Sequence, residues 1–322
     1  MENTLAEEVS CAPRFDQSVP AGGYAWWYVD GLSDDGQRGV TIIGFVGSVF
    51  SPYYAWSGRG SPEEHCAMNV AVYEPRGGRW AMTERGRSSL DRSATHLTIG
   101  PSSMRWTGEE LQIDLAEISC PIPKRIRGRV CVRPRLQSAQ SFFLDETQRH
   151  NCWPLAPLCT VEVELEHPDV QWQGHGYFDC NWGDQALEDA FSYWSWARVT
   201  DGATTRIVYD VERRDRSTHG LALDFDASGR PPPISPPPMN EARRVFWGVK
   251  RRGRSDEGFA IRRSLEDSPF YTRSIIDASW DGQLLRGVHE SLSLDRFASW
   301  WVKLMLPFRM PRAIYNVNSS GR

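Results

Sequence analysis

Apolar and polar residues alternate along many short segments of the chain, and this pattern predicts β-strands. Residues 158–166 (LCTVEVELE) show it most clearly, because Val161, Val163 and Leu165 would share one face while the glutamates occupy the other. Successive side chains of a strand point to opposite faces, so each such segment has one buried and one solvated face. Further strand-like segments are 39–50, 67–73, 94–100, 111–117 and 128–133, and, in the second half of the chain, 191–199, 205–211, 219–225, 244–250, 271–278 and 283–292.

Turn signals such as SDDGQRG, EPRGGRW and TGEE separate these segments. Hardly any helical pattern lies between them, which is typical of antiparallel barrels and sandwiches. The sequence therefore predicts an all-β fold of two consecutive antiparallel β-barrels or sandwiches with few short helices. We place the N-terminal barrel at residues 1–184 and the C-terminal barrel at residues 185–322.

The composition of the 322-residue chain argues against several classes of protein. A formal net charge of -4 gives no overall reason to expect binding to nucleic acid. Seven cysteines without a C-x-x-C pair predict free thiols, and no spacing of histidines and cysteines matches a zinc site. The acidic start MENTLAEEVS lacks the apolar core of a secretory signal, and no apolar run is long enough for a transmembrane helix. We therefore expect a cytosolic protein whose membrane contact is peripheral.

The segment 300–311 (WWVKLMLPFRMP) is apolar with sparse cations, and two interpretations are open. It could be a final strand or helix that closes the second barrel. Alternatively, it is an interfacial anchor whose aromatic side chains enter the acyl boundary while its cations contact lipid headgroups. The aromatic residues of this anchor would be Trp300, Trp301 and Phe308, and the cations Lys303, Arg309 and Arg312.

The stretch GHGYFDCNWGD is too polar for an ordinary buried strand and too aromatic for an ordinary loop. On an extended strand, Asp179, Tyr177 and His175 share one face and Phe178 lies on the other. A solvated aspartate titrates at about pH 4, but burial among apolar side chains can raise the pKa of a carboxyl group by several units. We predict that burial among Tyr177, Phe178 and Trp182 keeps Asp179 protonated.

Five segments of the chain resemble the carotenoid 1,2-hydratase (hydroxyneurosporene synthase) family of purple photosynthetic bacteria. They are 22–30 (GGYAWWYVD), 47–56 (GSVFSPYYAW), 79–86 (RWAMTERG), 150–157 (HNCWPLAP) and 174–183 (GHGYFDCNWG). The resemblance extends from about Phe15 to Tyr315 and implies a pair of lipocalin-like barrels. It also implies an enzyme that adds water across the C1–C2 double bond of acyclic carotenoids such as lycopene and neurosporene.

Carried over residue by residue, the resemblance implies that Asp179 is the proton donor, with Tyr177 and His150 as catalytic companions. His150 could activate the attacking water or hydrogen-bond Asp179, and the sequence leaves both roles open. We expect other side chains to bind the substrate, several of them by presenting aromatic faces to a carbocation. These are Trp153, Tyr53, Tyr54, Phe178, Trp182 and His175.

The leading hypothesis is therefore a hydro-lyase that needs neither a cofactor nor a metal. Because its carotenoid substrate resides in the bilayer, we expect peripheral attachment to the inner face of the photosynthetic membrane. The alternative is a lipocalin-like protein that binds or chaperones a lipid or polyene without transforming it. Asp179 lies near the expected boundary between the barrels, which favours a pocket between them. The sequence gives no indication of the oligomeric state.

Overall fold

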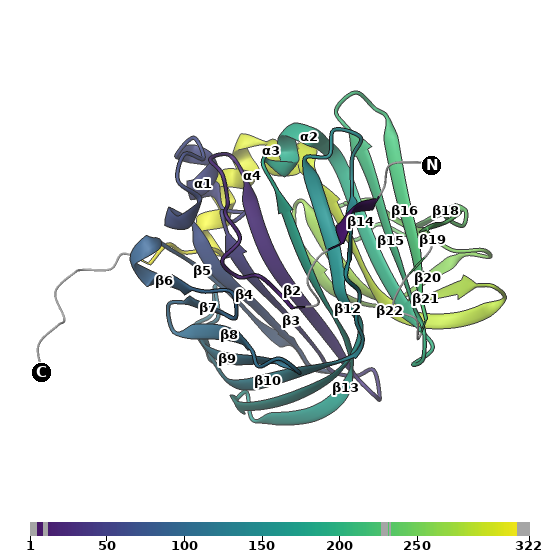
Figure 1. Cartoon of the computed structure of the whole chain (residues 1–322), viewed down its shortest axis with the longest axis horizontal. Coiled ribbons are helices and arrows are strands. Elements are labelled where there is room, and N and C mark those ends of the chain that lie inside the picture. Colours follow the sequence, from purple (N-terminus) through teal and green to yellow (C-terminus); the bar gives the residue numbers. More distant parts are fainter. Residues whose placement is uncertain (1–4, 9–11, 227–230, 232, 314–322) are drawn as a thin grey trace, which may run out of the picture.

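The computed structural model describes residues 5–8, 12–226, 231 and 233–313, and β-strands dominate it (Figure 1). A first sheet of 13 strands takes up the N-terminal part of the described chain. Its strands are β1 (Leu5–Glu8), β2 (Tyr24–Ser33), β3 (Gly39–Val46), β4 (Cys66–Tyr73), β5 (Gly78–Arg85), β6 (Leu90–Arg92), β7 (His96–Ile99), β8 (Ser102–Trp106), β9 (Leu111–Ile118), β10 (Arg125–Leu136), β11 (Gln140–Phe143), β12 (His150–His167) and β13 (Val170–Gly183).

The rest of the described chain forms a second sheet of seven strands, a two-stranded sheet and a few short helices. The second sheet consists of β14 (Phe191–Thr200), β15 (Thr205–Arg213), β16 (Thr218–Phe225), β17 (Pro233–Ile234), β20 (Phe259–Asp267), β21 (Tyr271–Trp280) and β22 (Gln283–Ser293), and the small sheet of β18 (Met239–Ala242) and β19 (Arg251–Arg254). The helices are α1 (Pro52–Trp56), α2 (Leu187–Ala190), α3 (Leu294–Ala298) and α4 (Trp300–Met305), with 3₁₀ turns η1 (Pro62–Glu64), η2 (Arg87–Ser89) and η3 (Leu306–Phe308).

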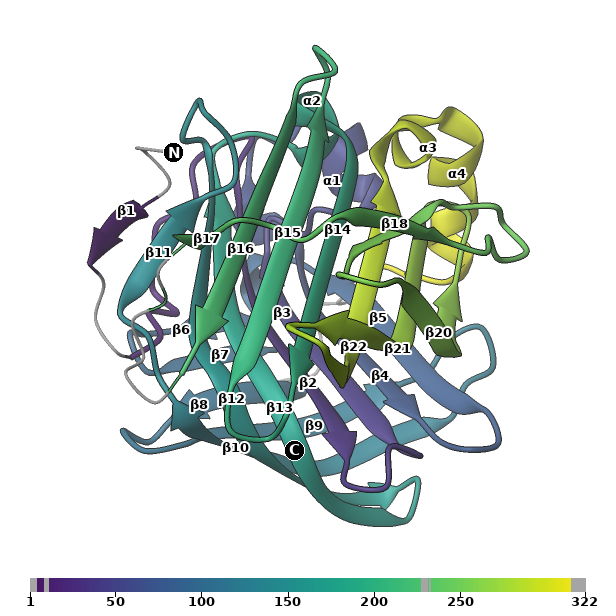
Figure 2. The ribbon, with the colours of Figure 1, turned by 90° about the vertical axis from the view of Figure 1, so that its right-hand side faces the viewer.

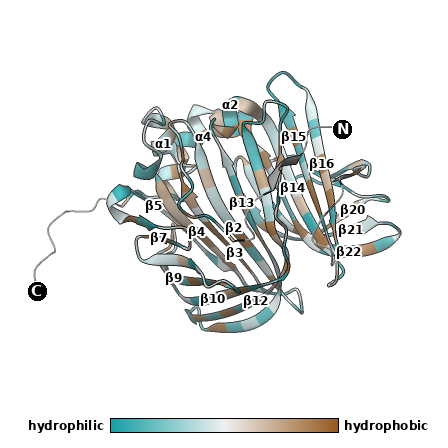
Figure 3. Cartoon of the chain, viewed as in Figure 1, coloured by the Kyte–Doolittle hydropathy of each residue, from teal (hydrophilic) through white to brown (hydrophobic). Residues whose placement is uncertain are grey.

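The first sheet curls into a nearly closed barrel with a core of its own. In β9 the buried positions alternate with more exposed ones, as the sequence pattern predicts. The hydrophobic positions, brown in Figure 3, are prominent on β2, β3 and β4 in the middle of this sheet. Side chains that fill the barrel include Trp27, Val29, Ile42, Met68, Leu97, Met104, Ile113, Val130, Val161 and Phe178.

Part of the outer face of the barrel, including that of β2, β3 and β13, is covered by the second sheet, and a second core lies between the two. Figure 2 shows β14, β15, β21 and β22 in front of the strands of the first sheet. Tyr24 and Tyr28 from β2 and Tyr177 from β13 belong to this second core. They pack with side chains of the second sheet that include Trp194, Trp196, Tyr209, Val211, Ile275 and Leu292.

The predicted all-β fold with few short helices is confirmed. One predicted strand is wrong, because residues 244–250 form a turn in which the N–H of Gly248 bonds to the carbonyl of Val245. Gly248 has a positive φ of 70°, which suits a turn and not a strand. The chain passes from the first sheet to the second over residues 184–190, and the division into two separate domains stays a prediction.

A buried ion pair and a hydrogen bond to a second buried ion pair join the two sheets. Nε of Arg198 (β14) donates to both carboxylate oxygens of Asp30 (β2) at 2.8 and 2.9 Å, and neither side chain is exposed. A second link joins Tyr28 (β2), whose hydroxyl donates to Glu290 (β22) at 2.8 Å, and Glu290 pairs with Arg273 (β21). Breaking such a pair leaves an uncompensated charge in a medium of low polarity, so these contacts fix how the sheets are aligned.

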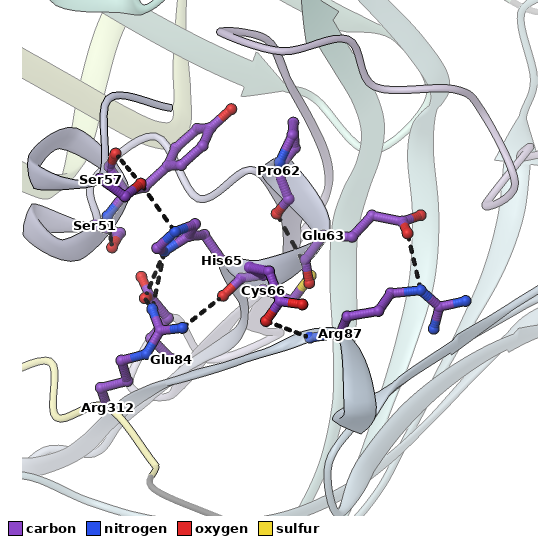
Figure 4. A network of polar contacts seen from close by, with 11 residues as sticks. Ser51, Ser57, Pro62, Glu63, His65, Cys66, Glu84, Arg87 and Arg312 are labelled. Carbon is purple, nitrogen blue, oxygen red and sulfur yellow. Dashed lines mark hydrogen bonds and ion pairs between the residues drawn. The ribbon is translucent and has the colours of Figure 1, made fainter. Parts of the chain in front are cut away.

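The segment after α4 returns to the first sheet and is fastened there. In the network of Figure 4, Arg312 contacts both Glu84 (β5) and His65, while Nδ1 of His65 lies 2.8 Å from Glu84 and Nε2 lies 3.1 Å from Ser57. The backbone N–H of Glu84 also donates to the carbonyl of Pro311 at 2.9 Å. The C-terminal helices are thus attached at both ends. Among the described residues, no helix has both the length and the apolar character needed to cross a membrane.

We expect Arg198→Met to lower the free energy of unfolding by about 3–5 kcal/mol, because it leaves the Asp30 carboxylate buried without its partner. The double variant Asp30→Asn, Arg198→Met should lose clearly less than the sum of the single variants. Urea unfolding of the four proteins measures this. Arg129→Met, which breaks an ion pair with Asp114 between half-exposed side chains, is the matched control and should cost under about 1 kcal/mol.

Candidate functional site

The alternation of β13 decides which side chains reach the space between the sheets. Tyr177 belongs to the second core, whereas Phe178 and Cys180 point into the barrel. Asp179 therefore lies on the outer face of the barrel, covered by the second sheet. The preceding Gly176 lets β13 approach β2 and β12 closely, since a Cβ there would collide with the carbonyl oxygen of Asp30.

Three side chains from both sheets hydrogen-bond the carboxyl group of Asp179. The hydroxyls of Tyr177 (β13) and Tyr209 (β15) lie 2.9 and 3.0 Å from Oδ2. The amide Nδ2 of Asn181 donates to Oδ1 at 2.8 Å. Two of these partners come from the same strand and the third comes from the opposite sheet, so the site is complete only when the sheets are packed together.

Opposing effects set the proton affinity of this carboxyl group. Burial raises the pKa of Asp179 to about 7, and the charge of Glu290 adds to the rise. The hydrogen bonds from Tyr177, Tyr209 and Asn181 lower the pKa, because they stabilise the ionised form. A substantial fraction of Asp179 is therefore protonated at neutral pH, in a place shielded from bulk solvent.

Aromatic rings surround the carboxyl group. The ring of Trp196 (β14) lies 5.1 Å from Tyr177, 5.4 Å from Tyr28 and 6.5 Å from Tyr209, measured between centroids. The indole Nε1 of Trp196 and the Oδ1 of Asn181 are buried without a hydrogen-bond partner among the described residues. Buried polar atoms are usually satisfied, so these two are suited to hold a water molecule or a polar group of a ligand.

His150 lies on the same face of the first sheet but is not in contact with Asp179. It pairs with Gly183 across β12 and β13, which places it about 13 Å along the strand from Asp179. Its Nδ1 lies 2.9 Å from the hydroxyl of Tyr24, and its Nε2 has no partner among the described residues. Burial lowers the pKa of His150 to about 4, so the imidazole is neutral at pH 7.

The tryptophan implied by the family resemblance lies on the other side of the strand. Trp153 points into the barrel core, where its Nε1 donates to the carbonyl of Ser138 at 2.7 Å. Its neighbour Cys152 is the β12 side chain that faces the second sheet, opposite Asn181. The strand alternation therefore takes Trp153 away from Asp179 and places Cys152 in the wall of the site.

Other predicted substrate-binding residues are likewise not brought to Asp179. Phe178 and Trp182 pack on the barrel side. Tyr54 (α1) is fully buried and its hydroxyl donates to the carbonyl of Gly23, while the ring of Tyr53 packs on Trp56. His175 shares the face of Asp179, as the alternation predicts, but its Nδ1 lies 3.4 Å from Nη1 of Arg198. Burial lowers the pKa of His175 to about 4.

Sequence reasoning missed three residues that complete the site, namely Tyr209, Trp196 and Tyr28. A usable signal was present, because β2 carries aromatic residues at Tyr24, Trp26 and Tyr28, and β14 carries Trp194 and Trp196, all spaced by two. Such spacing puts rings on one face of a strand. In the described residues, no cluster of three or more His, Cys, Asp or Glu side chains is arranged to hold a metal ion.

With this geometry established, comparison with known proteins identifies the family. The family model described as Carotenoid hydratase CrtC matches residues 42–318. The chain belongs to the carotenoid hydratase family. It is 50% identical over 306 residues to an acyclic carotenoid 1,2-hydratase of Thiocapsa roseopersicina, covering 93% of this chain and 76% of the relative. It is 44% identical over 309 residues to an enzyme of the same name from Rubrivivax gelatinosus, covering 94% and 76%.

The predicted carotenoid hydratase family is thereby confirmed, and with it the assignment to the hydro-lyases of carotenoid biosynthesis. Solved structures similar to this member of the family show the fold alone. One is kievitone hydratase from Nectria haematococca, with a TM-score of 0.56, 10% identity and coverage of 91% of this chain and 97% of that one. Another is a putative AttH protein from Nitrosomonas europaea, with a TM-score of 0.56, 15% identity and coverage of 88% and 99%.

The raised pKa of Asp179 predicts a pH-dependent effect of Asp179→Asn on stability. Between the unfolded pKa of 3.8 and the folded value of about 7, the folded protein binds one proton more than the unfolded chain, so the stability contributed by this group falls as pH rises. The asparagine side chain at position 179 does not titrate, so the variant does not lose this stability as pH rises. Its stability relative to the unmodified protein should therefore rise by about 2–3 kcal/mol between pH 5 and pH 8.

Urea unfolding at the two pH values measures the change, and any constant cost of placing an amide at position 179 cancels in the comparison. Equal differences in stability at pH 5 and pH 8 would contradict the assigned protonation state.

Proposed function

We propose that this chain adds water across the C1–C2 double bond of an acyclic carotenoid such as lycopene or neurosporene, with Asp179 as the proton donor. The observation that carries the proposal is a buried carboxyl group with a pKa of about 7, enclosed by aromatic rings and held by hydroxyls from both sheets. Membership of the carotenoid hydratase family supports the choice of substrate class.

The first step is transfer of the Asp179 proton to C2. The π electrons of the double bond form the new C–H bond, and the positive charge develops at C1, a tertiary carbon. The general acid must hold its proton until an alkene arrives, and it must become a stable anion afterwards. Burial supplies the first property, and the donors Tyr177, Tyr209 and Asn181 supply the second.

The carbocation is stabilised by its surroundings and then captured by water. Aromatic faces attract a positive charge, and each desolvated contact contributes about 2 kcal/mol. Trp196, Tyr177 and Tyr209 supply such faces next to the acid. The oxygen of a water molecule bonds to C1 and loses a proton to the Asp179 carboxylate, which restores the acid and yields a tertiary alcohol. In this scheme one carboxyl group acts first as acid and then as base.

The role proposed for His150 follows from its position. With Nδ1 at Tyr24 and a pKa near 4, it is a neutral imidazole whose Nε2 is free to bind water. It is too far along the strand to hydrogen-bond Asp179 or the attacking water, so we propose that it binds a water molecule on the way to the site. Because the substrate resides in the bilayer, we also propose peripheral attachment of the protein to the inner face of the photosynthetic membrane.

Replacing Asp179 by Asn should lower the rate of hydration by roughly 10²–10⁴-fold, since a general acid contributes a factor of this order. The test incubates purified protein with lycopene in detergent micelles and ¹⁸O-labelled water under argon, and detects the labelled alcohol by mass spectrometry. Binding of the polyene should survive in the variant. If the unmodified protein binds lycopene but leaves it chemically unchanged, the result would favour the alternative hypothesis of a lipid-binding or chaperoning protein.

Replacing Tyr209 by Phe should shift the pH–rate profile. Only protonated Asp179 is active, so the rate falls as pH rises through about 7. Loss of a donor that lowers the pKa should move this descending limb to higher pH and reduce the maximal rate. Tyr193→Phe removes a hydroxyl that contacts Ser291 in the same sheet, and this control should leave the profile unchanged. An unshifted profile in Tyr209→Phe would rule out its contact with the acid.

A further inference from the structure

The helical segment formed by α4 and η3 carries apolar side chains all round apart from Lys303. Its buried side chains Val302 and Leu306, and Met310 just after it, belong to the core between the sheets. The opposite face is also apolar and is exposed to solvent: Trp300 (74%), Trp301 (38%), Leu304 (54%), Met305 (41%) and Phe308 (77%). Positions 300, 304 and 308 follow the helical spacing of four, so these side chains form a stripe. A helix that is apolar all round is normally covered on every side.

Two further segments extend this apolar surface. Ile122 is 66% exposed in a turn whose Cys120 Sγ lies 3.0 Å from the carbonyl oxygen of Phe308. Phe246 is 90% exposed and stacks edge-on against Trp247 at 5.5 Å. Exposed apolar side chains from three separate parts of the chain thus surround one region. We call the set Trp300, Trp301, Leu304, Met305, Phe308, Ile122 and Phe246 the apolar rim.

The apolar rim adjoins a cavity of about 270 Å³ between the sheets. Met305 belongs to both the rim and the cavity wall, and Trp247 in the wall adjoins Phe246 in the rim. Most of the wall is apolar, with contributions from Ile43, Phe50, Trp80, Phe270, Leu306 and Met310. The volume is slightly below the ~300–1,000 Å³ found for small-molecule sites, so it suits the end of a C40 polyene and leaves the rest outside.

The registers of both sheets connect this cavity to the acid. In the first sheet, Asp179 pairs with Tyr28, Tyr28 with Ile43 and Ile43 with Asn69, so these side chains form one row on the face toward the second sheet. Ile43 and Asn69 line the cavity. With strands about 4.8 Å apart, Asn69 lies about 14 Å from Asp179.

The second sheet carries a matching row. Tyr209 pairs with Trp196, Trp196 with Glu290 and Glu290 with Arg273. Glu290 and Arg273 line the inner end of the cavity. The two rows touch where Tyr209 meets Asp179 and again where Tyr28 meets Glu290. The cavity and the acid therefore lie along one path between the sheets, and the contact of Tyr28 with Glu290 stands between them.

We propose that the apolar rim docks on a lipid bilayer and that the cavity beneath it receives the carotenoid chain directly from the membrane. This inference rests on the proposed function, since it concerns how the substrate of that reaction reaches Asp179. The end group enters at Met305 and Trp247 and advances along the two rows past Tyr28 and Glu290. The remainder of the polyene extends from the cavity wall at Trp80 into the bilayer.

A bilayer fits this surface better than another protein does. The rim presents two tryptophans, a residue type that occupies the interface between acyl chains and headgroups. Arg309 lies at its edge, with its guanidinium 4.8 Å from the centroid of Trp80 in the cavity wall, whereas Lys303 pairs with Glu188. Cations at this position attract anionic headgroups while the apolar side chains enter the acyl region.

The test compares delivery of lycopene from vesicles of phosphatidylcholine and phosphatidylglycerol with delivery from detergent micelles. In the triple variant Trp300→Ser, Leu304→Ser, Phe308→Ser, flotation with the vesicles should be lost, and kcat/KM for vesicle-borne lycopene should fall by at least about tenfold. Turnover in micelles should stay within about twofold, because none of these side chains touches the acid.

Leu284→Ser, which removes a side chain of 68% exposure next to the β21–β22 turn, is the matched control and should behave as the unmodified protein.

Two outcomes would overturn the docking proposal. One is a triple variant that floats and turns over vesicle-borne lycopene as before. The other is a dimer in light scattering that dissociates in the triple variant, which would make the rim an interface between copies of the chain. Flotation is measured without turnover, so failure of hydration in micelles by the unmodified protein would reject the proposed function and leave the docking result intact.

A second variant tests the cavity. Asn69→Trp places a large side chain in the wall about 14 Å from Asp179. It should raise KM for lycopene in micelles by about tenfold while the midpoint of the pH–rate profile stays unchanged, since the acid and its donors are untouched. An unchanged KM would show that the polyene takes another route.

Discussion

The structure depends on a carboxyl group that two sheets share. Asp179 belongs to the first sheet by its backbone, yet one of its hydrogen-bond donors, Tyr209, belongs to the second. The group is buried only because the second sheet covers the outer face of the first barrel. The Asp30–Arg198 ion pair holds that arrangement from the neighbouring strands β2 and β14, where Asp30 pairs with Tyr177, two residues from Asp179. The packing of the sheets therefore determines how deeply Asp179 is buried, and the burial in turn determines its proton affinity.

The sequence predicted the features that local periodicity controls. Alternation along β13 placed Tyr177 with Asp179 and set Phe178 on the opposite side, and the structure agrees. The same rule applied to β12 would have separated Cys152 from Trp153, but the family resemblance pointed to the tryptophan. The alternation shows that position 152 is the one that faces the acid.

Features that depend on long-range packing were not predictable in the same way. No periodicity says which face of the second sheet meets the first, so Tyr209, which is 30 positions from Asp179, escaped notice. The C-terminal segment posed a different difficulty. Its apolar residues are compatible with either a strand or a helix, and the structure shows a helix with one buried and one exposed apolar face. The buried face agrees with a helix that closes the second core, and the interpretation of residues 300–311 as a membrane anchor stays a prediction.

The buried charges near Asp179 occur as pairs, and this matters for the chemistry. An isolated arginine beside the acid would lower the pKa of Asp179 and would also repel a carbocation. Here Arg198 pairs with Asp30 and Arg273 with Glu290, and the charge of Glu290 raises the pKa of Asp179. Burial is the largest influence on this pKa. The Asp30–Arg198 pair and the Tyr28–Glu290 hydrogen bond align the sheets while leaving the space around the acid suited to a short-lived cation.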